Sequence, residues 1–273
     1  MKMVENIAAL TIAGSDPGAG AGVYADLKTF FALGVYGTAV ITAVTAQDFR
    51  EVTAVQPIDP EIVEKQLIAV LGSFPIKAIK TGMLFSAEII ETAAGILKRY
   101  PGLPLVIDPV LASTSGRTLL REEAVVLLER ELFPLSVLVT PNIAEAEILG
   151  DINIDITTPA GLEKAAVELY KKFKIPVLLK GGHFPGSACD VLCDNRGTAI
   201  FSTGLVKGVN NHGSGCTFAA AITARLACGL GLREAVSQAK TYITGALQSP
   251  HQLDEATRVI NHAWDGINES LPC

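Results

Sequence analysis

Residues 7–43 read IAALTIAGSDPGAGAGVYADLKTFFALGVYGTAVITA, and this stretch decides the fold. The apolar run 7–13 predicts a buried strand, and a glycine-rich loop ends it. Residues 21–32 carry a helical pattern that Gly34 closes, and residues 35–43 predict a second strand. A strand, a helix and a strand in this order predict a parallel sheet that is covered on both faces.

The same alternation continues along the chain. Further strands are predicted at 52–57, 76–81, 105–108, 136–140 and 176–180, and helices at 60–71, 87–99, 121–132, 142–150, 159–173, 215–228 and 233–249. Two runs, 189–194 and 199–203, predict a hairpin around Asn195-Arg196-Gly197. No Pro/Gly/Ser-rich linker and no change of composition divides the chain, so we predict a single α/β domain over residues 1–273.

Composition excludes several classes of function. Of the 273 residues 49% are hydrophobic, and the formal net charge of −6 leaves no basic stripe for nucleic acid. No apolar run reaches the about 18 residues of a membrane span, and the N-terminus lacks the apolar core of a signal peptide. Five cysteines without a paired framework favour reduced thiols and the cytoplasm. Cys189 and Cys193 lack a second ligand pair, which argues against zinc.

Five glycine-rich or polar segments follow predicted strands, namely 14–22, 80–83, 108–110, 140–145 and 180–183. Parallel sheets bind ligands at the carboxyl ends of their strands, so five such segments together predict one site along that edge. The first of them has neither the G-x-x-x-x-G-K-[ST] nor the G-x-G-x-x-G spacing. We therefore interpret it as a permissive loop that lets a small ligand approach the backbone.

Residues 211–217 read NHGSGCT and lead into an alanine-rich helix. The backbone N–H groups of Gly213, Ser214 and Gly215, together with the helix dipole, predict an anion hole. The same field is expected to lower the pKa of the Cys216 thiol and to make a thiolate available near neutral pH. This combination indicates phosphoryl transfer to an alcohol, or thiol nucleophile chemistry. The structural alternative is a tight turn, a helix cap and a small buried cysteine.

The charged side chains at this edge each allow two interpretations. Asn142 and Glu145 fit a helix capping box, or Glu145 orders the waters of a magnesium ion with Asp108 on the same side. Lys180 either faces water or supplies compact positive charge to a phosphate. Asp26, one turn into its helix, is either a solvated charge or a hydrogen-bond partner for a ligand amine.

A set of nine segments resembles the hydroxymethylpyrimidine/phosphomethylpyrimidine kinase family. They are ALTIAGSDP (9–17), GAG (20–22), ADLKTF (25–30), TAVTAQ (42–47), KTGM (80–83), DPV (108–110), TPN (140–142), KGGH (180–183) and HGSGCT (212–217). The resemblance runs in order from about residue 7 to 250. It implies the ribokinase-like fold, a three-layer α/β/α architecture with a small flanking strand element. It also implies an ATP- and Mg²⁺-dependent thiamine-pathway kinase that phosphorylates a hydroxymethyl group and then the resulting monophosphate.

The resemblance also implies roles for individual residues. The pyrimidine would be surrounded by Gly14, Ala21, Asp26, Gln47, Met83 and Val110. The Gln47 amide can accept from and donate to an aminopyrimidine. Lys180, Asn142 and His212 would bind ATP, with Glu145 and Asp108 near magnesium. The turn from Gly213 to Cys216 would be the anion hole, and Cys216 the base that accepts the alcohol proton. A homodimer is the expected assembly.

The chain departs from the family pattern at Gly18-Ala19, Phe49 and Asn211, which affects substrate preference more than the kinase class. An alternative enzyme is a pyridoxal kinase of the same fold, although Gln47 and Asp26 fit an aminopyrimidine better than a phenolic pyridine. A pyrimidine sensor without catalysis would not need the phosphate-binding residues. A thiol hydrolase is the weakest alternative, since no motif places a histidine to activate Cys216.

Overall fold

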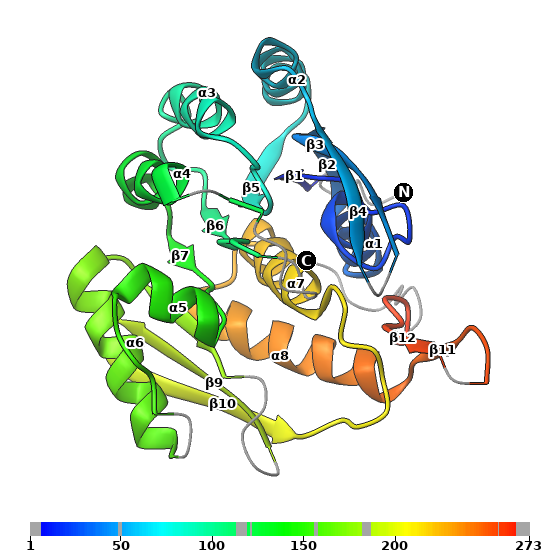
Figure 1. The fold of residues 1–273 in the computed structure, drawn as a ribbon, viewed down its shortest axis with the longest axis vertical. Coiled ribbons are helices and arrows are strands. Elements are labelled where there is room, and N and C mark those ends of the chain that lie inside the picture. Colours follow the sequence, from blue (N-terminus) through cyan, green and yellow to red (C-terminus); the bar gives the residue numbers. More distant parts are fainter. Residues whose placement is uncertain are drawn as a thin grey trace, which may run out of the picture.

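The computed structural model describes residues 7–48, 51–112, 119–120, 122–155, 158–181, 187–255 and 257–265. Its centre is an eight-stranded sheet in the order β10-β9-β8-β7-β6-β5-β1-β2 (Figure 1). The parallel strands are β1 (Ala8–Ala13), β2 (Tyr36–Ile41), β5 (Ile76–Thr81), β6 (Leu105–Ile107), β7 (Leu138–Val139) and β8 (Val177–Lys180). β9 (Ser187–Asp194) and β10 (Gly197–Gly204) add an antiparallel hairpin at one edge. The predicted mostly parallel sheet and its hairpin are confirmed.

One face of the sheet packs against α1 (Gly22–Ala32), α7 (Ser214–Ala227) and α8 (Leu232–Gln248). The strands supply small residues here, such as Ala9 and Ala78, and α7 meets them with buried alanines. Small side chains on both partners let helix and sheet approach closely. This close packing fixes the N-terminal end of α7 at the carboxyl edge of the central strands.

The opposite face carries larger residues, because side chains alternate along a strand. Leu10, Ile12 and Ile79 pack there with α2 (Pro60–Ser73), α3 (Ala87–Leu97) and α4 (Glu122–Leu127). α4 continues as a π-helical turn, Leu128–Leu132, and a 3₁₀ turn, Phe133–Leu135. Farther along the sheet, α5 (Ile143–Gly150) and α6 (Pro159–Phe173) cover β8 and β9. Helices on both faces confirm the predicted three-layer α/β/α architecture.

Two short antiparallel pairs lie outside the main sheet: β3 (Ala43–Gln47) with β4 (Val52–Pro57), and β11 (His251–Gln252) with β12 (Arg258–Val259). The predicted strand 35–43 therefore breaks at Thr42. The buried Thr42 hydroxyl donates to the Met83 carbonyl at 2.6 Å, and its N–H donates to the Ala13 carbonyl. The chain turns at this point into the flanking pair, which carries Gln47 to the edge of the sheet.

Two further expectations concern the membrane and the cysteines. In the described part of the chain no helix is both long and apolar enough to span a bilayer. Cys189, Cys193 and Cys216 are free thiols. Cys228, just after α7, is disulfide-bonded, so the expectation of five reduced thiols is wrong for this residue.

Candidate active site

A cavity of about 570 Å³ opens at the carboxyl edge of the sheet. With one exception, the predicted site residues all line it: Gly14, Ala21, Gln47, Met83, Asp108, Val110, Asn142, Glu145, Lys180, His212, Gly213, Ser214, Gly215 and Cys216. The exception is Asp26. Gly182, His183 and Phe49, which the sequence analysis also singled out, lie outside the described residues. The five segments at the strand ends thus contribute to one site, as the topology predicted.

The glycine turn before α7 forms part of the cavity wall. Gly213 has φ +78°, a conformation that favours glycine, and the Ser214 N–H donates to the Asn211 carbonyl at 3.0 Å. A Cβ built on Gly215 would lie 3.1 Å from the Lys180 ammonium nitrogen. Glycine at this position therefore lets Lys180 approach the N-terminus of α7. The turn combines backbone N–H groups with a lysine, which suits a phosphate group.

Lys180 is held by a carboxylate rather than by water. Its ammonium donates to Asp108 Oδ1 at 2.7 Å, and the Thr140 hydroxyl donates to the same oxygen at 3.0 Å. Burial alone would raise the pKa of Asp108, but Lys180 and Lys80 together hold it below its usual range. Asp108 in turn raises the pKa of Lys180 against the opposing effect of burial. Both groups are charged, and the water-facing interpretation of Lys180 is wrong.

Asn142 and Glu145 form the capping box at the start of α5. The Asn142 side chain accepts from the Glu145 N–H at 2.9 Å, and Glu145 Oε2 accepts from the Asn142 N–H at 2.8 Å. Glu145 is buried, and this burial, reinforced by the nearby Asp108 charge, raises its pKa to about 7. The capping interpretation is confirmed. The same carboxyl also lines the cavity, so Glu145 can contact a ligand while it caps the helix.

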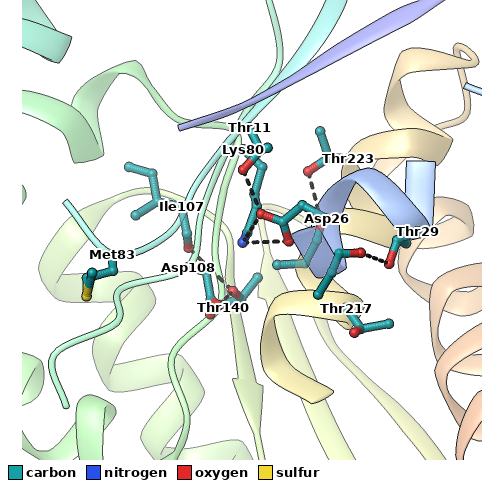
Figure 2. Close-up of polar contacts among 12 residues, drawn as sticks. Thr11, Asp26, Thr29, Lys80, Met83, Ile107, Asp108, Thr140, Thr217 and Thr223 are labelled. Carbon is teal, nitrogen blue, oxygen red and sulfur yellow. Dashed lines mark hydrogen bonds and ion pairs between the residues drawn. The ribbon is translucent and has the colours of Figure 1, made fainter. Parts of the chain in front are cut away.

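Asp26 lies behind the cavity and does not contact it. Figure 2 shows Lys80 of β5 reaching the Asp26 carboxylate on α1, with distances of 2.9 and 2.8 Å from Lys80 Nζ. The Thr11 hydroxyl donates to Asp26 Oδ2 at 2.6 Å, and both charged side chains are fully buried. The Asp26 carboxylate raises the pKa of Lys80 although burial opposes it, so Lys80 stays charged. The expectation that Asp26 hydrogen-bonds a ligand is thus corrected: its partners are Lys80 and Thr11.

Cys216 lies in the first turn of α7, as predicted, but its acidity differs from the expectation. Burial raises the pKa of the thiol to about 11. Lys80 opposes this rise, whereas the carboxylates of Asp108 and Asp26 add to it. The expected thiolate near neutral pH is therefore wrong for this site. The loss of water on burial and the two nearby negative charges raise the pKa of the thiol, although it lies in the first turn of a helix.

Asp16 is a further residue of the site, which the sequence pattern did not predict. Its Oδ1 accepts from the Gly18 N–H at 2.9 Å, and its Oδ2 accepts from Gly20 and Ala21 at 3.1 and 2.8 Å. His212 Nε2 lies 2.9 Å from the same Oδ2. An Asp before a Pro-Gly turn often binds the following N–H groups, so the sequence contained a signal for the loop contacts. It contained none for the histidine.

The two ends of the cavity differ in chemistry. At one end Gln47 lies within hydrogen-bonding reach of Asp16, beside Met83 and Val110. Apolar side chains line the other end: Leu205, Val206, Val209, Phe218, Ile243 and Leu247. A buried pair, Lys240 and Asp190 at 2.7 Å, borders this apolar end. The sequence pattern did not predict that wall, since its residues come from α7, α8 and the loop between β10 and α7.

Known proteins resemble this chain in sequence and in fold. A family model for phosphomethylpyrimidine kinase matches residues 16–261. The chain is 46% identical over 247 residues to the hydroxymethylpyrimidine/phosphomethylpyrimidine kinase of Rhizobium meliloti, with 90% of this chain and 92% of that protein covered. It is 44% identical over 254 residues to the thiamine biosynthesis bifunctional protein ThiED of Geobacter sulfurreducens, covering 93% of this chain but only 51% of that protein. The chain thus spans about half the length of this bifunctional relative.

A solved structure extends the comparison to a second substrate. The ADP complex of Bacillus subtilis pyridoxal kinase superposes with a TM-score of 0.84 at 35% identity, covering 93% of this chain and 96% of that one. The fold therefore accommodates adenine nucleotides in a relative.

Proposed function

Because the chain belongs to the phosphomethylpyrimidine kinase family, we propose that it phosphorylates 4-amino-5-hydroxymethyl-2-methylpyrimidine with ATP and then phosphorylates the monophosphate to the diphosphate. These steps would serve thiamine biosynthesis, and the whole chain would act as one kinase domain. One observation carries the proposal: the Gly213–Cys216 turn and the Lys180 ammonium border the same cavity as Gln47. A kinase for this alcohol needs such a phosphate subsite beside a ring subsite.

The ring would bind at the end formed by Gln47, Met83, Val110, Gly14 and Ala21. A side-chain Cβ at Gly14 would collide with the Met83 methyl group, so glycine leaves room for the Met83 side chain over the loop. The Gln47 amide offers one acceptor and two donor hydrogens, which match the ring nitrogen and exocyclic amine of an aminopyrimidine. The hydroxymethyl group would then point toward Cys216 and the glycine turn.

The triphosphate would lie along the glycine turn, with the nucleoside toward the apolar wall near Phe218 and Ile243. The N–H groups of Gly213 and Gly215 and the Lys180 ammonium would hold the γ-phosphoryl group, whereas the Ser214 N–H is engaged by the Asn211 carbonyl. In the transfer the alcohol oxygen bonds to the γ-phosphorus, the bond from that phosphorus to the ADP oxygen breaks, and the alcohol proton leaves. Phosphoryl transfer depends mainly on positioning and charge neutralisation, which this arrangement supplies.

We propose Cys216 as the acceptor of the alcohol proton. With a thiol pKa of about 11, only a small fraction is thiolate at neutral pH, so this step requires ionisation of the thiol in the substrate complex. Lys80 is the group that favours the thiolate most. Because general-base catalysis contributes less here than charge neutralisation, loss of Cys216 would slow the enzyme without abolishing transfer.

Magnesium fits the donor set of the site. Among the described residues no group of three His, Cys, Asp or Glu side chains could hold a metal ion. Mg²⁺, however, commonly uses one or two carboxylates and takes its other ligands from water and substrate phosphates. Asp108 and Glu145 both line the cavity and would provide these carboxylates. The ion would neutralise phosphate charge, and its own charge would favour ionised Glu145.

We further propose a homodimer in the cytoplasm. β2 is the outer strand of the sheet, and its Tyr36 stacks on Phe74 with ring centroids 5.9 Å apart. Both rings are exposed, as is Phe31 on the adjacent α1. Exposed aromatic groups beside an outer strand suit contact with a second copy of the chain. Sedimentation equilibrium of the purified protein would test this, and a single monomeric species would refute it.

The experiment that tests the function is product analysis with ATP and Mg²⁺. The free aminopyrimidine alcohol and pyridoxal are incubated separately with the protein, and products are followed by mass spectrometry. The proposal expects a pyrimidine monophosphate that converts to the diphosphate. Phosphorylated pyridoxal beside an unchanged pyrimidine would instead assign the vitamin B6 substrate, in line with the Bacillus subtilis neighbour.

A further inference from the structure

Two loops that are distant in the sequence meet at the Asp16 carboxylate. The first is residues 14–22, which would hold the ring, and the second is residues 210–215, which would hold phosphate. Asp16 is 1% exposed and accepts from three backbone N–H groups of its own loop. The fourth contact, to His212 Nε2 at 2.9 Å, crosses to the phosphate turn 196 residues later.

The His212 contact is supported on both sides. The His212 N–H donates to Asn210 Oδ1 at 2.8 Å, which fixes the backbone that carries the imidazole. His212 and the backbone hydrogen bonds lower the pKa of Asp16 against the effect of burial, so the carboxylate is ionised. An ionised carboxylate is an acceptor only, and the hydrogen bond therefore requires a proton on His212 Nε2.

A second contact joins the same two loops without a side chain. Gly213 packs so closely on Gly20 that a Cβ on Gly213 would lie 3.0 Å from Ala21 Cα and would collide with the Gly20 carbonyl. Backbone therefore meets backbone on one side, and carboxylate meets imidazole on the other. Two contacts of different kinds fix both the separation and the relative orientation of the loops.

We propose that Asp16 and His212 are positioning residues that couple the ring subsite to the phosphate subsite. The inference rests on the proposed function, because it takes the two loops as the two halves of one substrate site. A ligand that orders one loop also orders the other through this bridge. Because the first ligand has already ordered both loops, the second ligand causes a smaller loss of conformational entropy and binds more tightly. This is positive cooperativity.

Calorimetry would measure this coupling directly. The aminopyrimidine alcohol is titrated into the protein with and without the non-transferring ATP analogue AMP-PCP and Mg²⁺, and the ratio of the two dissociation constants is the coupling factor. Thermodynamic linkage requires the same factor when AMP-PCP is titrated instead. We expect a factor of about 5 or more for the native protein. For His212→Ala and Asp16→Asn we expect it to fall to within about twofold of one.

Two further variants make the result specific. His212→Gln retains an N–H donor of similar reach and should recover part of the coupling. Arg233→Ala removes a comparable ion pair, the one to Asp194 at 2.9 and 2.6 Å on the outer hairpin, and should leave the coupling factor unchanged. Full coupling in His212→Ala, or none in the native protein, would overturn the inference.

A readout without a ring ligand separates this inference from the proposed function. Hydrogen exchange of the Gly18–Ala21 amides is followed on adding AMP-PCP and Mg²⁺ alone. Protection should increase in the native protein and not in His212→Ala. If the native protein binds no pyrimidine but shows this protection, the substrate assignment fails and the coupling stands. If AMP-PCP binds without changing these amides, the coupling fails whatever the substrate is.

Discussion

Replacing Gly213 with alanine tests whether the phosphate turn has to pack against the ring-binding loop. Gly213 has φ +78°, where an alanine costs about 1–2 kcal/mol of backbone strain. The added Cβ would also lie 2.6 Å from the carbonyl carbon of Gly20. Carbon atoms in contact stay about 3.5–4.0 Å apart, so the turn and the loop would have to separate by about 1 Å.

A displacement of about 1 Å between reacting groups costs on the order of 10²-fold in rate. We therefore expect kcat of Gly213→Ala to fall about 100-fold in a coupled ADP-release assay. Thermal denaturation should show a lower Tm, since each kcal/mol of strain lowers Tm by about 2–4 °C in a chain of this size. At the assay temperature kcat should therefore fall by a much larger factor than the fraction of folded protein.

Gly208 provides the matched control for backbone strain. Its φ is +75°, but a Cβ built there has nothing within 4 Å. Gly208→Ala therefore carries the strain without the collision, and its kcat should stay within about twofold of the native value. Equal kcat in the two variants, whether both fall or neither does, would refute the argument from packing.

Four further predictions concern single contacts. Lys80→Met leaves the buried Asp26 carboxylate without its ion-pair partner and should lower the free energy of unfolding, measured in urea, by about 3–5 kcal/mol. Adding Asp26→Asn to this variant should restore most of the lost stability. Burial lowers the pKa of His262 to about 4. The free energy of unfolding should therefore be highest above about pH 6.5, where the histidine is neutral in both states, and should decline as the pH falls toward 4. Denaturation curves of His262→Gln should show a smaller decline. Gln47→Ala should raise the dissociation constant of the pyrimidine about tenfold and leave that of ATP alone, and an unchanged pyrimidine affinity would move the ring elsewhere. Cys216→Ala should lower kcat with little change in KM, and full activity would remove the base role.

The arrangement of strands and helices was largely predictable from hydrophobic periodicity. The strand predicted at 76–81 is β5, and the helix predicted at 159–173 is α6, with the same bounds. The break at Thr42 was not predictable, because apolar and β-branched residues run through it without interruption. Its cause is a tertiary contact, the hydrogen bond from the buried Thr42 hydroxyl to the Met83 carbonyl.

The outline of the site was also predictable, since strand order brings the segments at the carboxyl ends together. The partners of its charges were not. The position of Asp26 on a helix was predicted, but its pairing with Lys80, 54 residues away, depends on which strand pairs with β1, the strand that carries Thr11. The acidity of Cys216 was predicted in the wrong direction for the same reason. Helix position is local information, whereas burial and the carboxylates of Asp26 and Asp108 come from tertiary structure.

Selectivity between a pyrimidine and a pyridine has to arise at one end of the cavity. The phosphate end consists of backbone N–H groups, Lys180 and carboxylates, and these would act equally on any hydroxymethyl group placed before them. Bacillus subtilis pyridoxal kinase has the same fold at 35% identity, so the fold itself does not choose the ring. The choice would fall to side chains such as Gln47, whose amide would meet ring substituents in the proposed site. Asp16 bears on both ends, because it lies within reach of Gln47 and also holds His212 beside the phosphate turn. A change of ring preference at this carboxylate would therefore also change the rate of transfer, whereas a change at Val110 or Met83 could alter the ring preference alone.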